Sequence, residues 1–533
     1  MAYPQDFQES LAKLESGRPF RLGQDIPRLI EEERGRLIAD YHPDSRPEAM
    51  EELRLGANRG QRVPREFARV VEAYSLLTPD RLNLKEPDYQ VDMLVVGGGG
   101  AGCAAALTAQ SLGANVLLAT KLRLGDANTL MAEGGMCAPI RPGDSPYRHF
   151  LDTMGGGHYT NVPEIVKALV LDGPGVADWL LDLGVMFDFE EDGALKVNHC
   201  GGHSRKRMLS CKDLTGLEIM RVLRDEIQNR QIPYMEFSPV VEILLEEGGR
   251  CGGAVLYNLE TEEFYTVRAG AVILASGGIG RLHIQDFPTT NHYGATADGL
   301  VIAYRAGAEL LHMDSIQYHP TGVVWPEQML GQLITEVMRG HGAHLVNVEG
   351  ERFINELECR DTCASACIRE CVERKRGVVT PTMMEGVWLD TPMIQGVEKH
   401  FVGIYQRFNK YGIDIRREPI LIFPTQHYQN GGLKITPHGE TTVEGLYAAG
   451  EVSGGVQGKN RLAGNSLLDL FVFGRRSARR AVEGLTPGAV ALTPEHIHGY
   501  HKELTGLGVE KSRKSPLLLP DYIRVETKAR KCY

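Results

Sequence analysis

Apolar positions between residues 91 and 121 form two short runs with a segment of small residues between them. The run "MLVV" (93–96) predicts a buried parallel strand, "CAAALTAQSL" (103–112) a helix, and "NVLLATK" (115–121) the next strand. Two later runs, "AGAVILASGGIGR" (269–281) and "VEGLYAAGEVSGG" (443–455), each predict a strand that ends at a glycine turn. Strands that alternate with helices in this way are typical of an α/β sheet domain.

Residues 1–88 show a different pattern, in which apolar residues recur at helical spacing among many charged ones. The segments "IPRLIEEERGRLIADY" (26–41) and "REFARVVEAYSLL" (65–77) both have this period, and prolines separate such segments. We predict a helical extension that packs on the main body or on a partner. It contains no catalytic motif.

The composition narrows the classes of protein to consider. Of 533 residues, 42% are hydrophobic and 24% are charged, as in an ordinary globular protein. The formal net charge of −11 argues against a nucleic-acid-binding protein, which normally has a basic surface. Ten cysteines and an opening segment without an apolar signal core favour a reduced, cytoplasmic compartment. Residues 93–120 carry no charge, but their strand–turn–helix–strand pattern leads us to expect no membrane span there.

The turn after the first strand carries a nucleotide-binding fingerprint. Gly97, Gly99 and Gly102 have G-x-G-x-x-G spacing, which permits a tight turn, close approach to a pyrophosphate and close packing of the following helix. The second strand ends in Thr120–Lys121 instead of the acidic residue that usually binds a ribose. Glu451 follows a distant strand and glycine turn, as suits a flavin dinucleotide, and no second complete fingerprint follows a strand. The pattern therefore favours FAD over NAD.

Several long motifs further along the chain resemble those of one family. They are "TLMAEGG", "TADG", "QYHPTG", "LITEVMRGHG", "GERF", "RD", "PTQHYQNGG", "GLYAAGE" and "NRLAGNSLLDLFVFGR". The sequence is similar to flavoprotein subunits of succinate dehydrogenase and fumarate reductase, a family that includes soluble fumarate reductases and L-aspartate oxidase. The resemblance implies an α/β fold in which an α+β capping domain interrupts a Rossmann-like FAD-binding domain. The expected parts are a helical N-terminal extension (1–88), the FAD-binding domain (89–311 and 427–486), the capping domain (312–426) and a short C-terminal segment (487–533).

The resemblance also assigns roles to individual residues. His319, His427 and Arg461 match the dicarboxylate-binding positions of the family, and Thr335 is expected beside them. Arg360 matches the arginine that donates a proton to the substrate, and Arg360 is also expected to bind the substrate. Glu336 and Arg339 match the relay that reprotonates this arginine, and His319 is counted with the catalytic group. The cofactor-binding residues implied are Gly97, Gly99, Gly100, Ala101, Gly102, Thr120, Lys121, Asn128, Thr129, Gly134, Gly135, Asp298, Glu451, Asn465, Ser466 and Leu467.

These residue types suit the chemistry that the family carries out. A C4 dicarboxylate needs donor groups at both ends, and arginine gives planar, bidentate recognition. Charge drawn toward one carboxylate polarises the double bond, so that a hydride from flavin N5 attacks one carbon. The other carbon then needs a proton, which an arginine can supply only if neighbours perturb it. Glu336 and Arg339 are candidates for that role.

The sequence departs from the membrane-bound members of the family at several points. Those members carry a histidine just before "T-x-A-E-G-G" that links covalently to FAD, and Asn128 occupies this position. We therefore expect non-covalent FAD, a flavin that is a better reductant, and a preference for fumarate reduction. Leu217 stands where the respiratory enzymes often have a histidine, and the C-terminal segment is shorter than theirs. These differences indicate different partner surfaces.

Four cysteines recur every fourth residue, at 359, 363, 367 and 371. On a helix the outer two would lie about 18 Å apart along the axis, so all four cannot enclose one metal ion or cluster. We expect no metal and favour a stripe of small, buried residues. A redox pair formed by neighbours four residues apart stays open. Cys532 is expected on a C-terminal tail.

The resemblance leaves three functions to weigh. The first is the flavoprotein subunit of a fumarate reductase or succinate dehydrogenase, which receives electrons from a partner iron–sulfur subunit because this chain has no cluster or haem motif. The second is L-aspartate oxidase, which accepts an amino acid. The third is a flavin electron-transfer scaffold without dicarboxylate turnover, against which the intact set of histidines, arginines and Glu336 argues. If partners include membrane subunits, the chain associates with the membrane through them.

Overall fold

The largest sheet of the protein, in a computed structural model that describes residues 3–78, 82–485 and 490–520, has eight strands. Their order is β21-β9-β10-β11-β4-β5-β8, and β19 pairs with β11. Strands β4, β5, β8, β11 and β19 pair with one another in parallel. The pairings of β10 with β11, of β9 with β10 and of β21 with β9 are antiparallel. Their bounds are β4 Tyr89–Val96, β5 Val116–Ala119, β8 Tyr234–Met235, β9 Val240–Glu246, β10 Cys251–Tyr257, β11 Phe264–Leu274, β19 Leu446–Ala448 and β21 Leu492–Thr493.

The predicted strand–turn–helix–strand segment is present in this sheet. β4 contains the apolar run that predicted it, α4 (Gly100–Ser111) follows the glycine turn, and β5 lies beside β4 in parallel. The two later runs form β11 and β19. The α/β sheet is therefore confirmed. Further helices of this part of the chain are α5 Pro146–Gly156, α6 Pro163–Asp182, α7 Thr215–Asn229, α8 Asp298–Arg305 and α13 Asn465–Glu483.

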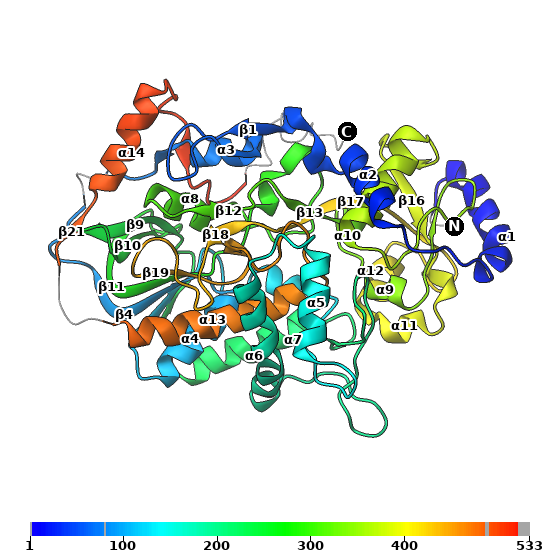
Figure 1. The fold of residues 1–533 in the computed structure, drawn as a ribbon, viewed down its shortest axis with the longest axis horizontal. Helices are drawn as coiled ribbons and strands as arrows, with labels where there is room; N and C mark the ends of the chain where they lie inside the picture. The colour runs from blue at the N-terminus through cyan, green and yellow to red at the C-terminus, as the bar shows by residue number, and fades with distance from the viewer. Residues whose placement is uncertain (1–2, 79–81, 486–489, 521–533) are drawn as a thin grey trace.

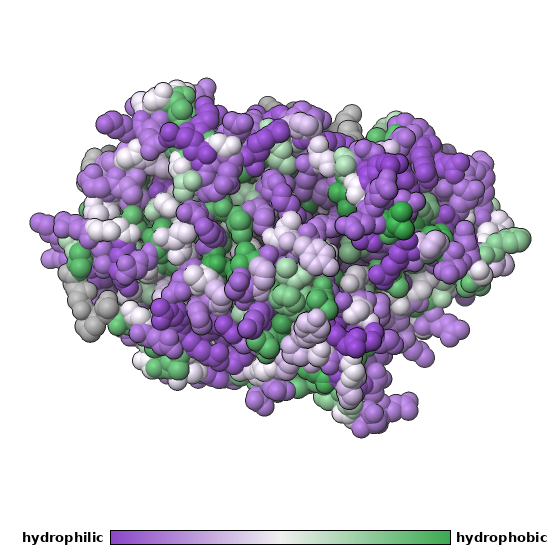
Figure 2. Space-filling view, in the orientation of Figure 1, coloured by the Kyte–Doolittle hydropathy of each residue, from purple (hydrophilic) through white to green (hydrophobic). Residues whose placement is uncertain are grey.

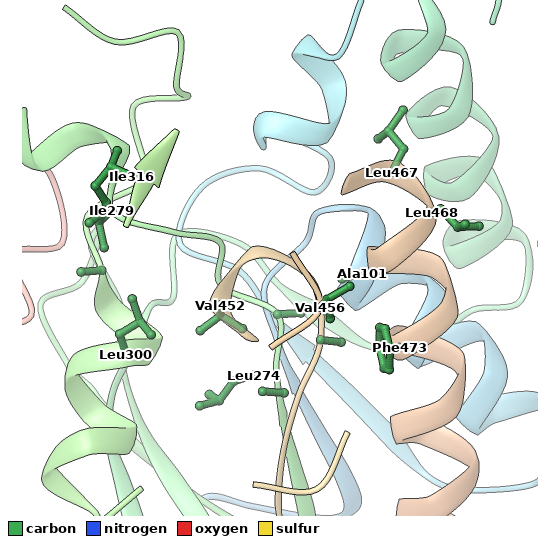
Figure 3. Close-up of a cluster of buried hydrophobic side chains, with 14 of the residues drawn as sticks. Ala101, Leu274, Ile279, Leu300, Ile316, Val452, Val456, Leu467, Leu468 and Phe473 are labelled. Carbon is green, nitrogen blue, oxygen red and sulfur yellow. The ribbon is translucent and has the colours of Figure 1, made fainter. Parts of the chain in front are cut away.

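Helix α13 packs on α4, the helix that begins at the nucleotide fingerprint. Gly474 allows this approach, because a Cβ there would come within 2.6 Å of the Ala101 carbonyl oxygen. Figure 3 shows Ala101 of α4 and Phe473 of α13 in one apolar cluster with Leu274 at the end of β11. Since Ala101 follows the glycine turn closely, this core holds the turn in place.

A second sheet of five strands has the order β13-β17-β16-β14, with β15 paired to β16. Its bounds are β13 Ile316–Val323, β14 Leu345–Val346, β15 Val378–Val379, β16 Glu385–Leu389 and β17 Ile420–Gln429. The helices near it in the chain are α9 Val337–Gly340, α10 Arg360–Ile368, α11 Val397–His400 and α12 Val402–Asn409. Helix α10 packs on β13 and continues as one π-helical turn, Arg369–Glu373. The predicted domain division at residue 426 falls inside β17, and the division into domains stays a prediction.

The N-terminal extension runs along one edge of the molecule, from α3 above α8 to α1 beside β16 (Figure 1). It is only partly helical, because β1 and β2 form a hairpin within it. The C-terminal strand β22 pairs with β3 of the extension. The bounds are α1 Gln8–Leu22, α2 Glu31–Tyr41, β1 Met50–Glu52, β2 Arg62–Pro64, α3 Arg65–Val71, β3 Tyr74–Ser75, α14 Glu495–Gly506 and β22 Lys514–Ser515. Residues 487–489 and 521–533 of the predicted C-terminal segment, Cys532 included, lie outside the described residues.

Two further small sheets are present among the described residues. Strands β12 (Leu310–Leu311), β18 (Gly432–Lys434) and β20 (Ser453–Gly454) form a three-stranded sheet, and β6 (Met136–Cys137) pairs with β7 (Met208–Leu209). The face in Figure 2 is mostly hydrophilic, with apolar residues scattered over it. Over the part of the chain that the structure describes, no helix is both long enough and apolar enough to cross a membrane.

Candidate active site

Glycines shape the turn between β4 and α4. Gly97 has a φ of +119°, a region that favours glycine, and a Cβ on it would collide with the Ala275 carbonyl. A Cβ on Gly102 would collide with the carbonyl of Gly97, so α4 lies directly against the turn. The Gly100 amide at the start of α4 donates to Thr129 Oγ1 at 3.1 Å. Bare backbone beside a helix N-terminus is the arrangement that accepts phosphate groups.

One cavity extends from this turn to residues of the second sheet. Gly102 and Asn465 are the predicted cofactor residues that do not line it. Asn465 is fully buried and is hydrogen-bonded to His149 Nε2 at 2.8 Å and to Thr153 Oγ1 at 3.0 Å, so its side chain supports the wall from behind. The predicted cofactor residues in the lining are Gly97, Gly99, Gly100, Ala101, Thr120, Lys121, Asn128, Thr129, Gly134, Gly135, Asp298, Glu451, Ser466 and Leu467.

Lys121, at the end of the second strand, is held by an acidic residue far away in the sequence. Its Nζ lies 2.6 Å from Asp298 Oδ2 and 2.7 Å from Thr296 Oγ1. Asp298 begins α8, so the pair connects the end of β5 to that helix. An acidic side chain thus lies beside the end of the second strand, where it pairs with Lys121.

Asn128 is fixed by three hydrogen bonds. Its Nδ2 donates to Asn291 Oδ1 at 2.6 Å and to Glu451 Oε2 at 3.3 Å, and its Oδ1 accepts from the His292 amide at 2.5 Å. Burial raises the pKa of Glu451 to about 6, while the Gln429 amide and Asn128 oppose this by hydrogen bonding. Both N–H groups of the Asn128 amide are therefore engaged with the protein.

The chemistry of the cavity suits a flavin dinucleotide. Glycine backbone and a helix start lie at one end, and an acidic side chain, Glu451, lies at a second wall. Gly99 lines the cavity as well, and a Cβ on it would come within 3.0 Å of the Ala127 side chain, so bare backbone is required there. These features fit a bound FAD.

Three arginines and one glutamate gather at the other end of the cavity. Arg360 Nε donates to Glu336 Oε2 at 2.6 Å, and Arg339 Nη2 lies 3.4 Å from the same oxygen. The Gly201 amide donates to Glu336 Oε1 at 2.8 Å. Arg461 Nη1 donates to Ser466 Oγ at 2.6 Å. Arg360, Glu336 and Arg461 line the cavity together with Thr335, whereas Arg339 lies behind Glu336.

Burial and mutual charge set the ionisation of this cluster. Burial disfavours the charged form of Glu336, but Arg360 and Arg339 outweigh it and lower the carboxyl pKa. Burial lowers the pKa of Arg461 to about 9, and the nearby charge of Arg360 adds to the effect. Near neutral pH the three guanidinium groups and one carboxylate therefore leave a surplus of two positive charges.

Two histidines complete this end of the cavity. The rings of His319 and His427 lie 5.0 Å apart, and both residues line the cavity. Burial, and then the charge of Arg360, lower both pKa values well below the usual range, so both rings are neutral. His319 Nδ1 accepts from the Thr321 amide at 3.2 Å, which assigns the ring proton to Nε2 as a donor.

Comparison with known proteins identifies the family. A model of the FAD binding domain family matches residues 92–467. In Methanothermobacter marburgensis, the A chain of the fumarate reductase (CoM/CoB) is 38% identical over 429 residues, which cover 78% of this chain and 76% of that protein. The chain belongs to the succinate dehydrogenase and fumarate reductase flavoprotein family. FAD is its cofactor, and it is an FAD-dependent oxidoreductase.

The flavoprotein is also similar to other members of this family. The L-aspartate oxidase of Streptomyces coelicolor is 35% identical over 443 residues, covering 79% of this chain and 74% of that one. The solved structure of quinol fumarate reductase from E. coli has a TM-score of 0.70 and 31% identity, and the match covers 79% of this chain and 74% of that chain. Both activities are therefore represented among similar proteins.

Sequence reasoning missed one residue of the flavoprotein site, Gln317. Its Oε1 accepts from Arg360 Nη1 at 2.9 Å and from Arg461 Nε and Nη2 at 3.2 and 3.0 Å. Its Nε2 donates to Asn460 Oδ1 at 3.1 Å and to the Arg461 carbonyl at 2.7 Å. The amide thus holds two guanidinium groups side by side without neutralising either. Its position two residues before His319 in "QYHPTG" was the only available signal.

The four cysteines of the flavoprotein lie on α10 and its π-helical continuation, apart from Cys359, which directly precedes α10. All are free thiols, and burial raises their pKa values far above the usual range, so the thiols stay protonated. Within the described ranges no group of three or more His, Cys, Asp or Glu side chains is arranged to hold a metal. Cys363 Sγ also lies 3.4 Å from Arg339 Nη1. The packing interpretation therefore fits the structure.

Proposed function

We propose that this flavoprotein interconverts fumarate and succinate and that it works in the direction of fumarate reduction. The observation that carries the proposal is the arginine cluster, in which Glu336 contacts Arg360 and Arg339 while Gln317 joins Arg360 to Arg461. Bound FAD supplies hydride-transfer chemistry to the substrate. The active site lies between the FAD-binding domain and the capping domain.

The surplus of two positive charges in this cluster supports a dianionic substrate. A C4 dicarboxylate carries two negative charges near neutral pH, so it balances the cluster. Arg461 and the neutral donors His319 and His427 bind the carboxylates, and Thr335 lies beside them. L-aspartate carries an ammonium group, which the surplus positive charge disfavours. This balance favours the dicarboxylate over the amino acid.

Arg360 delivers the proton to the substrate carbon in this proposal. Its Nε already lies 2.6 Å from Glu336 Oε2, which is the distance of a strong, charge-assisted hydrogen bond. Glu336 in turn lies between Arg360 and Arg339, so after each turnover its carboxylate takes a proton from the Arg339 guanidinium and passes it to Arg360. A proton from solvent then restores Arg339, which is fully buried and keeps Glu336 ionised between turnovers. The three side chains form the proton relay.

We further propose that FAD is bound without a covalent link and that an iron–sulfur subunit delivers the electrons. Asn128 has no nucleophilic side chain, and its amide is already hydrogen-bonded to Asn291, His292 and Glu451. A flavin without the link is the better reductant, which favours the fumarate-reducing direction. A redox titration that gives an unusually high flavin potential would contradict this direction.

The test is fumarate-dependent oxidation of a reduced viologen dye by the holoenzyme under anaerobic conditions. Arg360→Ala should lower the rate by about 10²- to 10⁴-fold, the usual contribution of a positioned acid. Arg416→Ala is the matched control, because Arg416 is half-exposed and its guanidinium contacts Asp414 and the Tyr405 ring, away from the cavity. Oxidation of L-aspartate without fumarate turnover would replace the proposal by L-aspartate oxidase. If Arg360→Ala keeps both its FAD and the wild-type rate of fumarate reduction, Arg360 is not the proton donor.

A further inference from the structure

The N-terminal segment 26–44 lies against two chain segments of the site, the one that carries Arg360 and the one that carries Gln317. Helix α2 packs on α10, the helix that begins with Arg360. The residues just after α2 reach the start of β13, the strand that carries Gln317 and His319. Figure 1 shows α2 beside α10. This segment precedes residues 92–467, which the FAD binding domain model matches.

The first contact is made at Glu358, two residues before Arg360. Its carboxylate is 1% exposed. Oε1 accepts from the Leu29 amide at 2.6 Å, and Oε2 lies 3.5 Å from Arg34 Nη2, which also donates to the Leu29 carbonyl at 3.2 Å. A buried carboxylate depends strongly on such partners. The segment therefore holds the chain at the point where it enters α10.

The second contact is made at the start of β13. Asp44 Oδ2 accepts from the Ile316 amide at 2.7 Å, one residue before Gln317. The buried ring of His42 stands edge-on to Tyr318 with the ring centres 5.6 Å apart. Since Gln317 accepts from Arg360, the two contacts act next to two members of one hydrogen-bonded group.

We propose that residues 26–44 form a positioning element of the active site, in which Arg34 acts through Glu358 on Arg360 and Asp44 acts through Ile316 on Gln317. The inference rests on the proposed role of Arg360 as proton donor. A proton donor displaced by about 1 Å from its working geometry loses on the order of 10²-fold in rate. Through Arg34 and Asp44 the segment thus positions active-site groups, and it is not only a surface for a partner.

The experiment compares Arg34→Ala with Arg36→Ala in the full-length holoenzyme. Both residues lie on α2, but Arg36 is 73% exposed and its guanidinium contacts Glu32 on the same helix. We expect Arg34→Ala to lower kcat for fumarate by about 10- to 100-fold, within the range for a misplaced donor, with KM changed far less. Arg36→Ala should match the wild type. Arg34→Lys keeps the positive charge beside Glu358 and should recover most of the rate.

A second measurement separates this inference from the proposed reaction. Hydrogen–deuterium exchange of the amides in residues 358–368 should become faster in Arg34→Ala and stay unchanged in Arg36→Ala. If the wild type does not reduce fumarate but the exchange responds in this way, the positioning role holds and the proposed reaction is wrong. If kcat and exchange in Arg34→Ala both equal those of Arg36→Ala, the positioning role is overturned. A lower melting temperature with unchanged kcat also overturns it, since it would indicate packing alone.

Discussion

Replacing Gln317 by glutamate tests whether the surplus charge of the arginine cluster selects the substrate. The change keeps the shape of the side chain and places a carboxylate where Oε1 accepts three N–H groups from Arg360 and Arg461. It also brings a carboxylate oxygen against Asn460 Oδ1 and the Arg461 carbonyl, which Nε2 now faces at 3.1 and 2.7 Å. We therefore expect some loss of thermal stability together with weaker binding of dicarboxylates.

The size of the binding effect follows from Coulomb's law. A substrate carboxylate bound on the far side of the same guanidinium groups lies about 7 Å from the new charge, two hydrogen-bond lengths plus the width of the group. At an effective dielectric constant of about 20, the repulsion is about 2.4 kcal/mol. One carboxylate at this distance therefore weakens binding by about 50-fold, since about 1.4 kcal/mol is tenfold. The second carboxylate of a dianion lies about 4 Å further away and adds about 1.5 kcal/mol, so the dianion should bind about 600-fold more weakly.

The assay is the dissociation constant of succinate for the Gln317→Glu holoenzyme, measured by calorimetry beside a monocarboxylate such as butyrate. Because the monocarboxylate carries only the nearer of the two charges, its affinity should fall by only about 50-fold. The defect should shrink at low pH, where protonation of the introduced carboxylate restores the charge of the wild-type cluster. Equal losses for both ligands, or a loss independent of pH, would refute the argument that net charge selects the dianion.

Three further predictions concern other parts of the flavoprotein. Gly97→Ala should weaken FAD binding by about 10- to 100-fold, because the left-handed backbone and the Ala275 carbonyl leave no room for a Cβ; the measure is the flavin-to-protein ratio, and full occupancy would contradict it. The hydrogen bond that His158 Nε2 donates to Asp361 Oδ2 at 2.5 Å raises the pKa of His158, although burial opposes it. The ion pair therefore stabilises the fold fully below the pKa of His158 in the unfolded state, and this stabilisation is lost as pH rises through the raised pKa of the folded state. His158→Gln should thus flatten the decline in melting temperature above neutral pH. If the melting temperatures of variant and wild type fall in parallel with pH, the pair does not stabilise the protein. Cys363 and Cys367 should resist alkylation in the native protein, because both thiols are buried and protonated; rapid labelling would favour a redox role.

The amino-acid sequence by itself determined the local parts of this protein. Apolar runs located β4, β5, β11 and β19, because a strand buried on both faces must be continuously apolar. Glycine spacing located the turn at residue 97, because a φ of +119° and a close carbonyl are local demands that glycine meets. Family motifs pointed to His319, Glu336, Arg360, His427 and Arg461, and all of these line one cavity.

Only the tertiary structure decided which of these residues touch the ligand space and which support it. Gly102, Asn465 and Arg339 do not line the cavity but lie behind the residues that do. Neither the motifs nor their spacing distinguishes these two positions. Gln317 joins two arginines that are 101 residues apart in the chain, and Asp298 reaches Lys121 from another helix. The contacts of residues 26–44 with Glu358 and Ile316 span more than half the chain. Such contacts depend on how elements far apart in the chain pack together. The order of residues along the chain does not specify how far apart these elements lie in space.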